Sequence, residues 1–438
     1  MLRRTSPYTM VFEITVEGLT RKSAVVLTTL ALCLLLTFAA FVSLIVGLLA
    51  DQRASPPREL LADGVAFAPN SASLLGRLAE VEMRDQERDL SRVEAHAELA
   101  VNVSPWDYRR RVLLAAVEEA KGDRGAAEQS LQKAVALAPN CTDVHWRFAN
   151  LLLREGKLEK SVEHFLKATS SNPSLLPLTL DLLWRVSGGK LTVMQAVTGG
   201  DPKSEFALAQ FLLNQSRAPE AVKAFSDIDR DWRLTSPESA GFVNSLIAAG
   251  RLAEARQLWA DIVSGDKQEE RNLPRISNGS FESDVVKGFD QFDWTIGRND
   301  YAVASVDAGV ARTGARSLRI DFLGRDTTRL DGQVKQMILV SPGARFRIEC
   351  YVKTEKLVAP EGPRVVITDI TSSTEIASSG PIASGSSDWR RVAVDFTAPP
   401  SARAVVVTVK RVPKFSFDQP TRGAVWFDDF TLTEQSQK

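Results

Sequence analysis

Side chains that could perform covalent chemistry are few in this 438-residue sequence. Three histidines and three cysteines leave little material for a zinc site or for histidine-based catalysis. A serine nucleophile elbow, a Walker loop and a zinc-binding H-E-x-x-H helix do not occur in it. Glycoside hydrolysis needs two carboxylates facing each other across a cleft, and Glu349, Glu355 and Asp369 form no convincing pair. We therefore expect a protein that is not an enzyme.

Charge and cysteine usage exclude two further classes of protein. Lys and Arg together number 54, as do Asp and Glu, so there is no basic surplus to bind nucleic acid. Three cysteines are too few for a disulfide framework, and we expect Cys33, Cys141 and Cys350 to be small buried apolar residues. The length allows two or three domains.

Residues 23–50 carry no charged side chain and are long enough to cross a bilayer as a helix. Basic residues are more numerous in residues 1–22 than just after the apolar stretch, where Arg53 and Arg58 follow. This asymmetry predicts a single-pass anchor with a cytoplasmic N-terminal segment, 1–22, and the bulk of the chain on the other side. A cleaved signal peptide and a buried helix of a soluble protein are the alternatives.

After the apolar stretch, amino-acid usage divides the chain into a short segment and two long parts. Residues 51–70 contain three prolines among polar residues and are predicted to be a linker. Residues 71–268 are rich in Ala, Leu, Glu, Lys and Arg at helical spacing, whereas residues 271–438 are rich in Val, Thr, Ser and Gly. The charged segment 266–274 between these two parts is a plausible hinge.

The helical part repeats itself every 34 residues. Prolines, glycines and small or large apolar residues recur at that interval, as in Pro105, Pro139 and Pro173, Gly122 and Gly156, Ala100, Ala134 and Ala168, and Leu131 and Phe165. This pattern resembles the tetratricopeptide repeat family. Small residues let paired helices approach closely, and proline ends the second helix. The match is best for residues 108–139 and 142–173 and is broken across residues 174–201; a generic helical solenoid is the alternative.

The resemblance implies that the first helix of each pair lines a concave groove for a peptide or helix of a protein partner. Counting along the period places six residues there: Arg109, Glu119, Asp143, Trp146, Asn150 and Arg154. A tryptophan with arginines nearby is typical of a protein-binding hot spot. Alternatively, Trp146 is a core residue covered by the following helix pair.

Residues 346–353 alternate strictly between apolar and polar side chains, which predicts a half-buried antiparallel strand. Several similar runs separated by Pro and Gly turns predict an all-β sandwich or jelly roll over residues 271–438. The motifs are Asn278 to Glu282, Trp294, Gly314 to Leu318, Trp389 and Trp426 to Asp429. In that order they resemble the jelly-roll carbohydrate-binding modules attached to bacterial cellulases and xylanases.

Sugar binding requires exposed aromatic rings, because a pyranose stacks its C–H face on them while polar groups bind its hydroxyls. Tyr351 lies on the polar side of its strand, and the resemblance implies further contacts in an early loop. The predicted carbohydrate-binding residues are Trp294, Tyr301, Tyr351, Arg347 and Lys353. The alternative is that Tyr351 is an ordinary surface residue and the tryptophans belong to the core; Trp389 and Trp426 are expected to be structural.

Many modules of that family hold a structural calcium ion between the opening glutamate and the closing aspartates. The resemblance thus implicates Glu282, Asp428 and Asp429, with backbone carbonyls completing the six to eight oxygen ligands that calcium takes. The alternative is that these carboxylates only cap loops at the strand ends.

The sequence thus predicts a multidomain protein: one transmembrane helix, an all-α tetratricopeptide-like solenoid and an all-β jelly-roll sandwich. We expect a bacterial inner-membrane protein whose bulk is periplasmic. Its predicted function is that of a scaffold that binds an envelope protein through the repeats and a glycan or second protein through the sandwich, with polysaccharide synthesis or export as the suggested setting. The alternatives are a dedicated carbohydrate-binding protein whose repeats are a spacer, and a polysaccharide-modifying enzyme.

Overall fold

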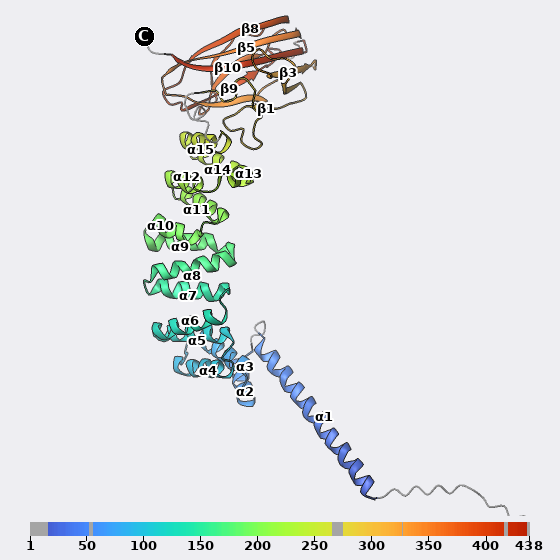
Figure 1. Cartoon of the computed structure of the whole chain (residues 1–438), viewed down its shortest axis with the longest axis vertical. Coiled ribbons are helices and arrows are strands. Elements are labelled where there is room, and N and C mark those ends of the chain that lie inside the picture. Colours follow the sequence, from blue (N-terminus) through green and yellow to red (C-terminus); the bar gives the residue numbers. More distant parts are fainter. Residues whose placement is uncertain (1–15, 52–55, 265–274, 326, 416–418, 436–438) are drawn as a thin grey trace, which may run out of the picture. The chain divides into compact units, whose positions relative to one another are not determined.

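The computed structural model describes residues 16–51, 56–264, 275–325, 327–415 and 419–435. Helices come first along the chain and strands last (Figure 1). The predicted fold class, with one apolar helix, helical repeats and a β-sandwich, is confirmed. The chain separates into two compact units, Met1–Gly199 and Gly200–Lys438, so the division falls inside the helical part.

The helices of the first unit follow one another with short turns. They are α1 (Val16–Ala50), α2 (Arg58–Phe67), α3 (Ala72–Arg84), α4 (Leu90–Val103), α5 (Tyr108–Lys121), α6 (Arg124–Leu137), α7 (Thr142–Arg154), α8 (Leu158–Ser171), η1 (Pro173–Leu175), α9 (Leu176–Ser187) and α10 (Leu191–Thr198). Within α1, residues Ser23–Leu49 form a helix long and apolar enough to cross a membrane, and this stretch is either a signal sequence or an anchor. Cys33 is exposed on α1 and Cys141 is half-buried, so of the three cysteines only Cys350 is buried as expected.

The predicted linker 51–70 is wrong in part, because it contains helix α2. The Pro56-Pro57 pair that favoured a linker directly precedes the helix, where proline's fixed φ is tolerated. Leu61 of α2 is fully buried. It belongs to an apolar cluster that joins α1, α2 and α3, with the members Leu61, Leu74 and Leu78 and the partly buried Val46, Leu49 and Val65.

Pairing of α5 with α6 and of α7 with α8 gives the two repeats that the sequence predicts best. Asp107 and Asp123 cap the N-termini of α5 and α6 by accepting backbone N–H groups, and Gly122 turns the chain between them at φ 90°. Ala100, Ala134 and Ala168 are all completely buried. Their burial agrees with the prediction that small residues occupy the positions where paired helices approach each other.

The helical part of the second unit is shorter and less regular. Its helices are α11 (Pro202–Asn214), α12 (Ala218–Ser226), α13 (Arg230–Thr235), α14 (Pro237–Ala248) and α15 (Leu252–Ser264). The predicted interruption of the repeats coincides with Gly188, Gly189, Gly199 and Gly200, which all have positive φ. Glycine adopts that conformation without the steric cost of a Cβ atom, and the second pair of glycines marks the division between the units.

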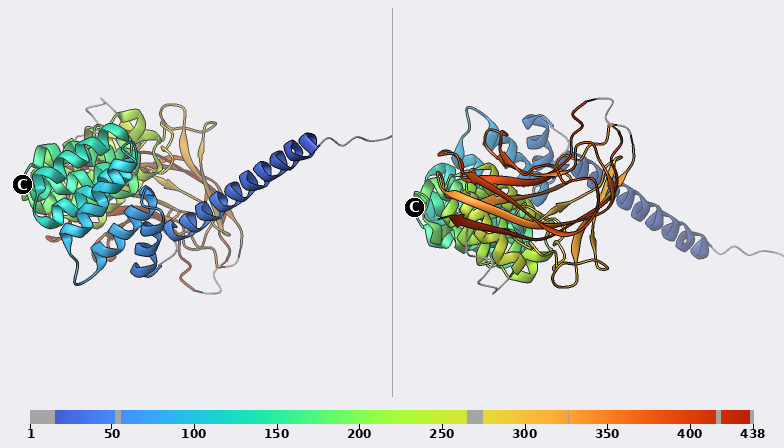
Figure 2. Two further views of the ribbon diagram at one scale, coloured as in Figure 1. Left: turned by 90° about the horizontal axis from the view of Figure 1, so that it is seen from below. Right: turned by 90° about the horizontal axis from the view of Figure 1, so that it is seen from above.

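Two five-stranded antiparallel sheets form the sandwich. The strands are β1 (Thr295–Ile296), β2 (Ala302–Asp307), β3 (Ser317–Leu323), β4 (Val334–Leu339), β5 (Arg345–Val358), β6 (Arg364–Asp369), β7 (Glu375–Ser378), β8 (Gly385–Thr397), β9 (Ala404–Lys410) and β10 (Arg422–Gln435). One sheet has the order β1-β4-β9-β6-β7 and the other the order β2-β3-β10-β5-β8. They pack face to face around one apolar core (Figure 2).

Strand β5 has the predicted register. Phe346, Ile348, Cys350 and Val352 are at most 3% exposed and point into the core, whereas the residues between them lie on the outer face. Burial raises the pKa of the Cys350 thiol. The alternation of the sequence therefore identified which side chains this sheet offers to solvent.

Helix α15 packs directly against the opening segment of the sandwich. The indole Nε1 of Trp259, which is 1% exposed, donates a hydrogen bond of 2.7 Å to the carbonyl of Phe289. The guanidinium of Arg256 lies 4.5 Å from the Trp259 ring centroid and donates to Ser277 Oγ. The predicted hinge at residues 266–274 lies outside the described residues, but the elements on its two sides share this buried contact.

Candidate functional sites

A pocket of about 420 Å³ lies between the first helices of the two best repeats, α5 and α7. It brings together five of the six predicted groove residues: Glu119, Asp143, Trp146, Asn150 and Arg154. Its lining also includes apolar side chains of α5 and α6, namely Val112, Ala115, Ala116 and Leu131. The pocket thus combines an apolar lining with polar groups, which is the usual composition of a binding site.

Arg109 is not among the residues that line this pocket, and its place in the groove stays a prediction. Its Nε atom instead donates a 2.9 Å hydrogen bond to Oδ1 of Asp107, the residue that caps α5. The count along the repeat placed Arg109 on the correct helix, but local capping chemistry draws its side chain to the helix end.

Ion pairs line the pocket and are mostly exposed to solvent. Arg154 forms a two-pronged pair with Glu119 of the preceding repeat, at 2.6 and 2.9 Å. Arg147 pairs with Asp143 one turn earlier on α7, at 3.0 Å. Exposed pairs of this kind contribute roughly 0–1 kcal/mol, so a ligand that supplies its own charge can replace either partner at little cost.

Trp146 is half-buried, so neither of the two predicted environments describes it fully. The indole packs against Phe165 of α8 in a T-shaped arrangement, with ring centroids 5.2 Å apart. The ring also contributes to the lining of the pocket. A tryptophan held in this way presents a rigid apolar surface and loses little conformational entropy when a ligand binds.

A histidine pair lies in the same repeat. His145 of α7 is completely buried, and its Nδ1 atom is 2.8 Å from Nδ1 of His164 on α8. The carbonyl of Pro139 accepts from Nε2 of His145 at 2.7 Å, which leaves Nδ1 of His145 to accept the hydrogen bond from Nδ1 of His164. Burial and the neighbouring His145 lower the pKa of His164 to about 4.

In the sandwich, Trp294 cannot serve as a sugar-stacking ring, and that prediction is wrong. Its side chain is 1% exposed and packs between Phe281 and Phe430, with ring centroids 5.3 and 4.8 Å away. Its Nε1 donates to the carbonyl of Asn278 at 3.2 Å. Trp294 is a core residue, which was the alternative considered for it.

Tyr351 lies on the outer face of its sheet as predicted, but another residue covers its ring. The guanidinium carbon of Arg312 lies 3.4 Å from the ring centroid. Tyr301, which is half-buried at the start of β2, remains a predicted sugar contact.

The two basic residues predicted beside Tyr351 are both paired with carboxylates. Arg347 binds Asp395 at 2.6 and 2.7 Å, and Lys353 binds Asp388 at 3.1 Å. These contacts lower the pKa of Asp395 and of Asp388, so both stay ionised near neutral pH. At these two positions the outer face of the sheet therefore offers charged pairs.

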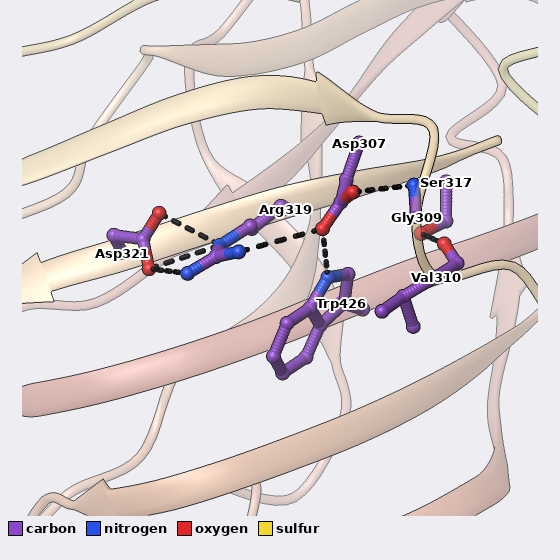
Figure 3. Close-up of polar contacts among 7 residues, drawn as sticks. All are labelled: Asp307, Gly309, Val310, Ser317, Arg319, Asp321 and Trp426. Atoms are coloured by element: carbon purple, nitrogen blue, oxygen red, sulfur yellow. Dashed lines mark hydrogen bonds and ion pairs between the residues drawn. The ribbon is translucent and has the colours of Figure 1, made fainter.

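A second covered ring, Trp426, lies on the same outer face and is only 2% exposed (Figure 3). Asp307 accepts a 2.8 Å hydrogen bond from its Nε1 atom, which lowers the pKa of that carboxyl group. The Arg319 guanidinium lies 5.1 Å from the ring centroid and pairs with Asp321 at 2.8 Å. The expectation that Trp426 is structural agrees with its burial.

The predicted calcium ligands bind backbone N–H groups of one loop, residues 312–316, and do not form a cluster of free oxygen atoms around a common point. Glu282 Oε1 accepts the backbone N–H groups of Ala315 and Arg316, at 2.8 and 2.9 Å. Asp428 is fully buried, and its Oδ2 accepts the N–H of Arg312 at 2.8 Å. The loop comes close enough to Glu282 that a Cβ atom on Gly314 would lie 2.3 Å from Oε1.

Asp429 binds the side chain of Arg312 at 2.6 Å, so a guanidinium already neutralises this end of the sandwich. Burial raises the pKa of Asp428. Among the residues that the structure describes, no group of three or more His, Cys, Asp and Glu side chains could hold a metal ion. The arrangement therefore does not fit calcium and agrees with the alternative that these carboxylates cap loops.

Sequence reasoning missed Arg312 and Arg319, which cover aromatic rings on the outer face of the sheet. For Arg319 a signal exists, because Arg319 and Asp321 alternate with Leu318, Ile320 and Phe322 along β3 and so share its outer face. For Arg312 there is none, since it lies in a loop whose path depends on Glu282 and Asp428.

Comparisons with known protein families match both parts of the chain. Residues 142–175 match the tetratricopeptide repeat model, and residues 274–414 match the carbohydrate binding domain model CBM_4_9. A search of curated proteins finds no match.

Solved structures similar to parts of the chain include three proteins. The crystal structure of MamA is 14% identical, with 44% of this chain and 89% of MamA covered and a TM-score of 0.26. A thermophilic tetratricopeptide protein of Thermus thermophilus is 25% identical, with coverages of 31% and 71% and a TM-score of 0.26. A CBM4 structure is 20% identical, with coverages of 36% and 99% and a TM-score of 0.27. Such TM-scores add nothing to the family matches. The chain therefore carries tetratricopeptide repeats in its N-terminal part and a carbohydrate-binding domain of the CBM_4_9 type at its C-terminus.

Proposed function

We propose that the protein is a non-enzymatic scaffold, anchored in the bacterial inner membrane, that holds a protein partner in the groove of its repeats outside the cytoplasm. The sandwich then binds a glycan or a second protein. Envelope polysaccharide synthesis or export would use both the groove of the repeats and the sandwich. The observation that carries the proposal is the pocket between α5 and α7, where Trp146 lies among exchangeable ion pairs.

The physical properties of the pocket favour a peptide or helix as its occupant. The apolar part of the lining rewards burial of one or two apolar side chains, at about 25 cal/mol per Å² of apolar surface. Asp143, Glu119 and the two arginines can bind a backbone or charged side chains of either sign. Tetratricopeptide repeats are protein-interaction modules, which supports the same class of ligand.

Packing at the end of α1 supports an anchor over a cleaved signal. Val46 and Leu49 are partly buried against the cluster around Leu61 and Leu74. A Cβ atom on Gly64 would lie 3.2 Å from Leu49 Cδ1, so the two helices are in close contact. Removal of residues 23–50 would expose apolar surface of α2 and α3 to water, at a cost in stability.

The proposal that the protein is not an enzyme is supported by two of the three carboxylates considered above, Glu349 and Asp369. Glu349 lies 3.5 Å from the Arg391 guanidinium. Asp369 accepts the N–H groups of Thr371 and Ser372 and so stabilises a turn. Neither residue has the free cleft position that an acid or base for glycosidic cleavage needs.

Site-specific photo-cross-linking in growing bacteria tests the proposal. A photoreactive amino acid at Asn150, inside the pocket, should cross-link to a discrete membrane or periplasmic protein. The same amino acid at Leu178, which is 55% exposed on α9, serves as the matched control. Equal cross-linking at both positions, or none at Asn150, would contradict a partner-binding groove.

The alternative of a dedicated carbohydrate-binding protein with the repeats as a spacer is favoured by the match of residues 274–414. It predicts retardation of the protein in gels that contain a soluble polysaccharide, together with no specific cross-linking from Asn150.

A further inference from the structure

Helix α2 exposes apolar side chains beside the apolar helix α1. Phe67 is 63% exposed and Leu60 is 47% exposed, and they lie seven residues apart on one side of α2. The ring of Phe67 meets the ring of Phe38 on α1 edge to face, with centroids 6.4 Å apart. The exposed face of α2 is therefore continuous with the surface of α1.

The depth of Phe38 in a bilayer follows from the length of α1. Ser23–Leu49 comprises 27 residues, which is roughly 40 Å of helix at about 1.5 Å per residue. A hydrocarbon core of about 30 Å takes only about 20 of them. Because Arg21 and Lys22 precede Ser23, the helix enters the core there and leaves it near Val42.

The packing of α1 agrees with that boundary. Val42, Val46 and Leu49 lie on one face of α1 and are partly buried, whereas the other apolar residues of the span are exposed. One face of the turns beyond Val42 thus contacts protein. Phe38 lies one turn before it, about 6 Å inside the boundary, which is within the 5–10 Å that an interfacial helix reaches.

We propose that α2 is an interfacial helix, whose Leu60 and Phe67 side chains rest in the lipid at the outer boundary of the bilayer that α1 crosses. This inference rests on the membrane anchoring proposed above. The exposed Glu59 and Asp63 limit the insertion, because carboxylates stay at the hydrated headgroup level. The base of the repeats is then held against the membrane surface instead of being tethered by a linker.

Lipid quenching in proteoliposomes tests this contact on the full chain. A polarity-sensitive fluorophore is attached to Phe67→Cys in a Cys33→Ala, Cys141→Ala background; Cys350 is 1% exposed and is retained. The vesicles contain phosphatidylcholine and phosphatidylglycerol with a nitroxide on the acyl chain, either near the headgroup or near the methyl end. Matched probes at Leu32→Cys, in the middle of the span, and at Leu178→Cys, on α9, serve as controls.

We expect the Phe67 probe to lose more fluorescence with the shallow nitroxide than with the deep one. The Leu32 probe should show the reverse order, and the Leu178 probe should not be quenched. If the Leu32 probe is quenched while the Phe67 probe behaves like the Leu178 probe, α2 does not lie in the lipid, although the proposed membrane anchor is supported. If Leu32 is not quenched, the proposed anchor fails and the inference fails with it. A Phe67 probe that is shielded from water without being quenched by lipid would assign this face to a protein and overturn the proposal.

Discussion

The groove of the repeats and the outer face of the β2-β3-β10-β5-β8 sheet both contain aromatic rings among charged residues, but the rings differ in how accessible they are to a ligand. In the groove, Trp146 packs on Phe165 in a T-shaped arrangement and contributes to the pocket lining. On the sheet, Arg312 covers Tyr351 and Arg319 covers Trp426. A ring next to a cavity can bind an apolar group directly, whereas a covered ring must first lose its cation. The comparison indicates that composition alone does not identify a binding surface.

The largest effect is expected where an aromatic ring is purely structural. Trp294→Ala should destabilise the second unit by about 3–5 kcal/mol, because it removes a buried indole and leaves a cavity. Chemical denaturation followed by circular dichroism measures it. Trp106→Ala, at a tryptophan that is 83% exposed, is the control and should change the stability by less than about 0.5 kcal/mol. Similar losses for both variants would contradict the buried position of Trp294.

The groove should carry the next largest effect. With the partner identified by cross-linking from Asn150, Trp146→Ala should weaken binding by about 2 kcal/mol, or roughly 30-fold. Isothermal titration calorimetry measures the change. Arg154→Ala, which leaves the packing on Phe165 intact, should weaken binding less. An unchanged affinity for Trp146→Ala would place the partner on another surface.

The two regions should also respond differently to acid, because all three histidines lie in the repeats. The folded-state pKa of His164 is about 4, below its usual 6.5, so the unfolded chain binds more protons between these values. The contribution of His164 to the free energy of unfolding is therefore fully present above pH 6.5 and is lost as the pH drops towards 4. Because His164 is only half-buried, we expect a loss of about 1–2 kcal/mol, below the full linkage value.

Urea unfolding at several pH values checks the acid response. His164→Phe keeps an aromatic ring beside Phe148 and should remove most of the pH dependence of the first unit. An equal pH dependence in the wild type and this variant would show that other groups cause it.

A smaller effect should reveal whether the covered rings can bind sugar. Arg312→Ala uncovers Tyr351 and removes a cation–π contact of about 0.5–1 kcal/mol. If Tyr351 is a platform, binding of the protein to a soluble polysaccharide should rise severalfold in affinity gels, and adding Tyr351→Ala should abolish the gain. If Arg312→Ala lowers the affinity instead, the arginine itself is the sugar contact and the comparison must be revised.

The smallest expected effect is that of chelation. Because Arg312 neutralises Asp429 and backbone N–H groups occupy Glu282 and Asp428, EDTA should not change the melting temperature of the protein. Differential scanning calorimetry with EDTA and with added calcium checks this. A clear stabilisation by calcium would restore the site implied by the family resemblance.

Properties that depend on periodicity were accessible from the sequence. The 34-residue interval placed Glu119, Trp146 and Arg154 on one face because helix geometry is regular within each repeat. The alternation along β5 likewise assigned Tyr351 to the outer face. In both cases the side-chain direction follows from local backbone geometry.

Properties that depend on distant contacts were not accessible. The burial of Trp294 requires Phe430 from the last strand, and the covering of Tyr351 requires a loop held by Asp428. Helix α2 was hidden because nearby prolines favour a linker, whereas its stability comes from apolar contacts with α1 and α3. No local pattern encodes such contacts.

The bond between Trp259 and the Phe289 carbonyl has a practical consequence for anyone who wishes to study the carbohydrate-binding part alone. A fragment that begins at residue 271, where the amino-acid usage changes, would lack α15, so the Phe289 carbonyl would lose its donor and the Phe292 ring would lose its contact with Trp259. Such a truncation should aggregate on expression. Cutting at Gly200 keeps the helices that shield this surface, so the division between the compact units is the better starting point for recombinant work.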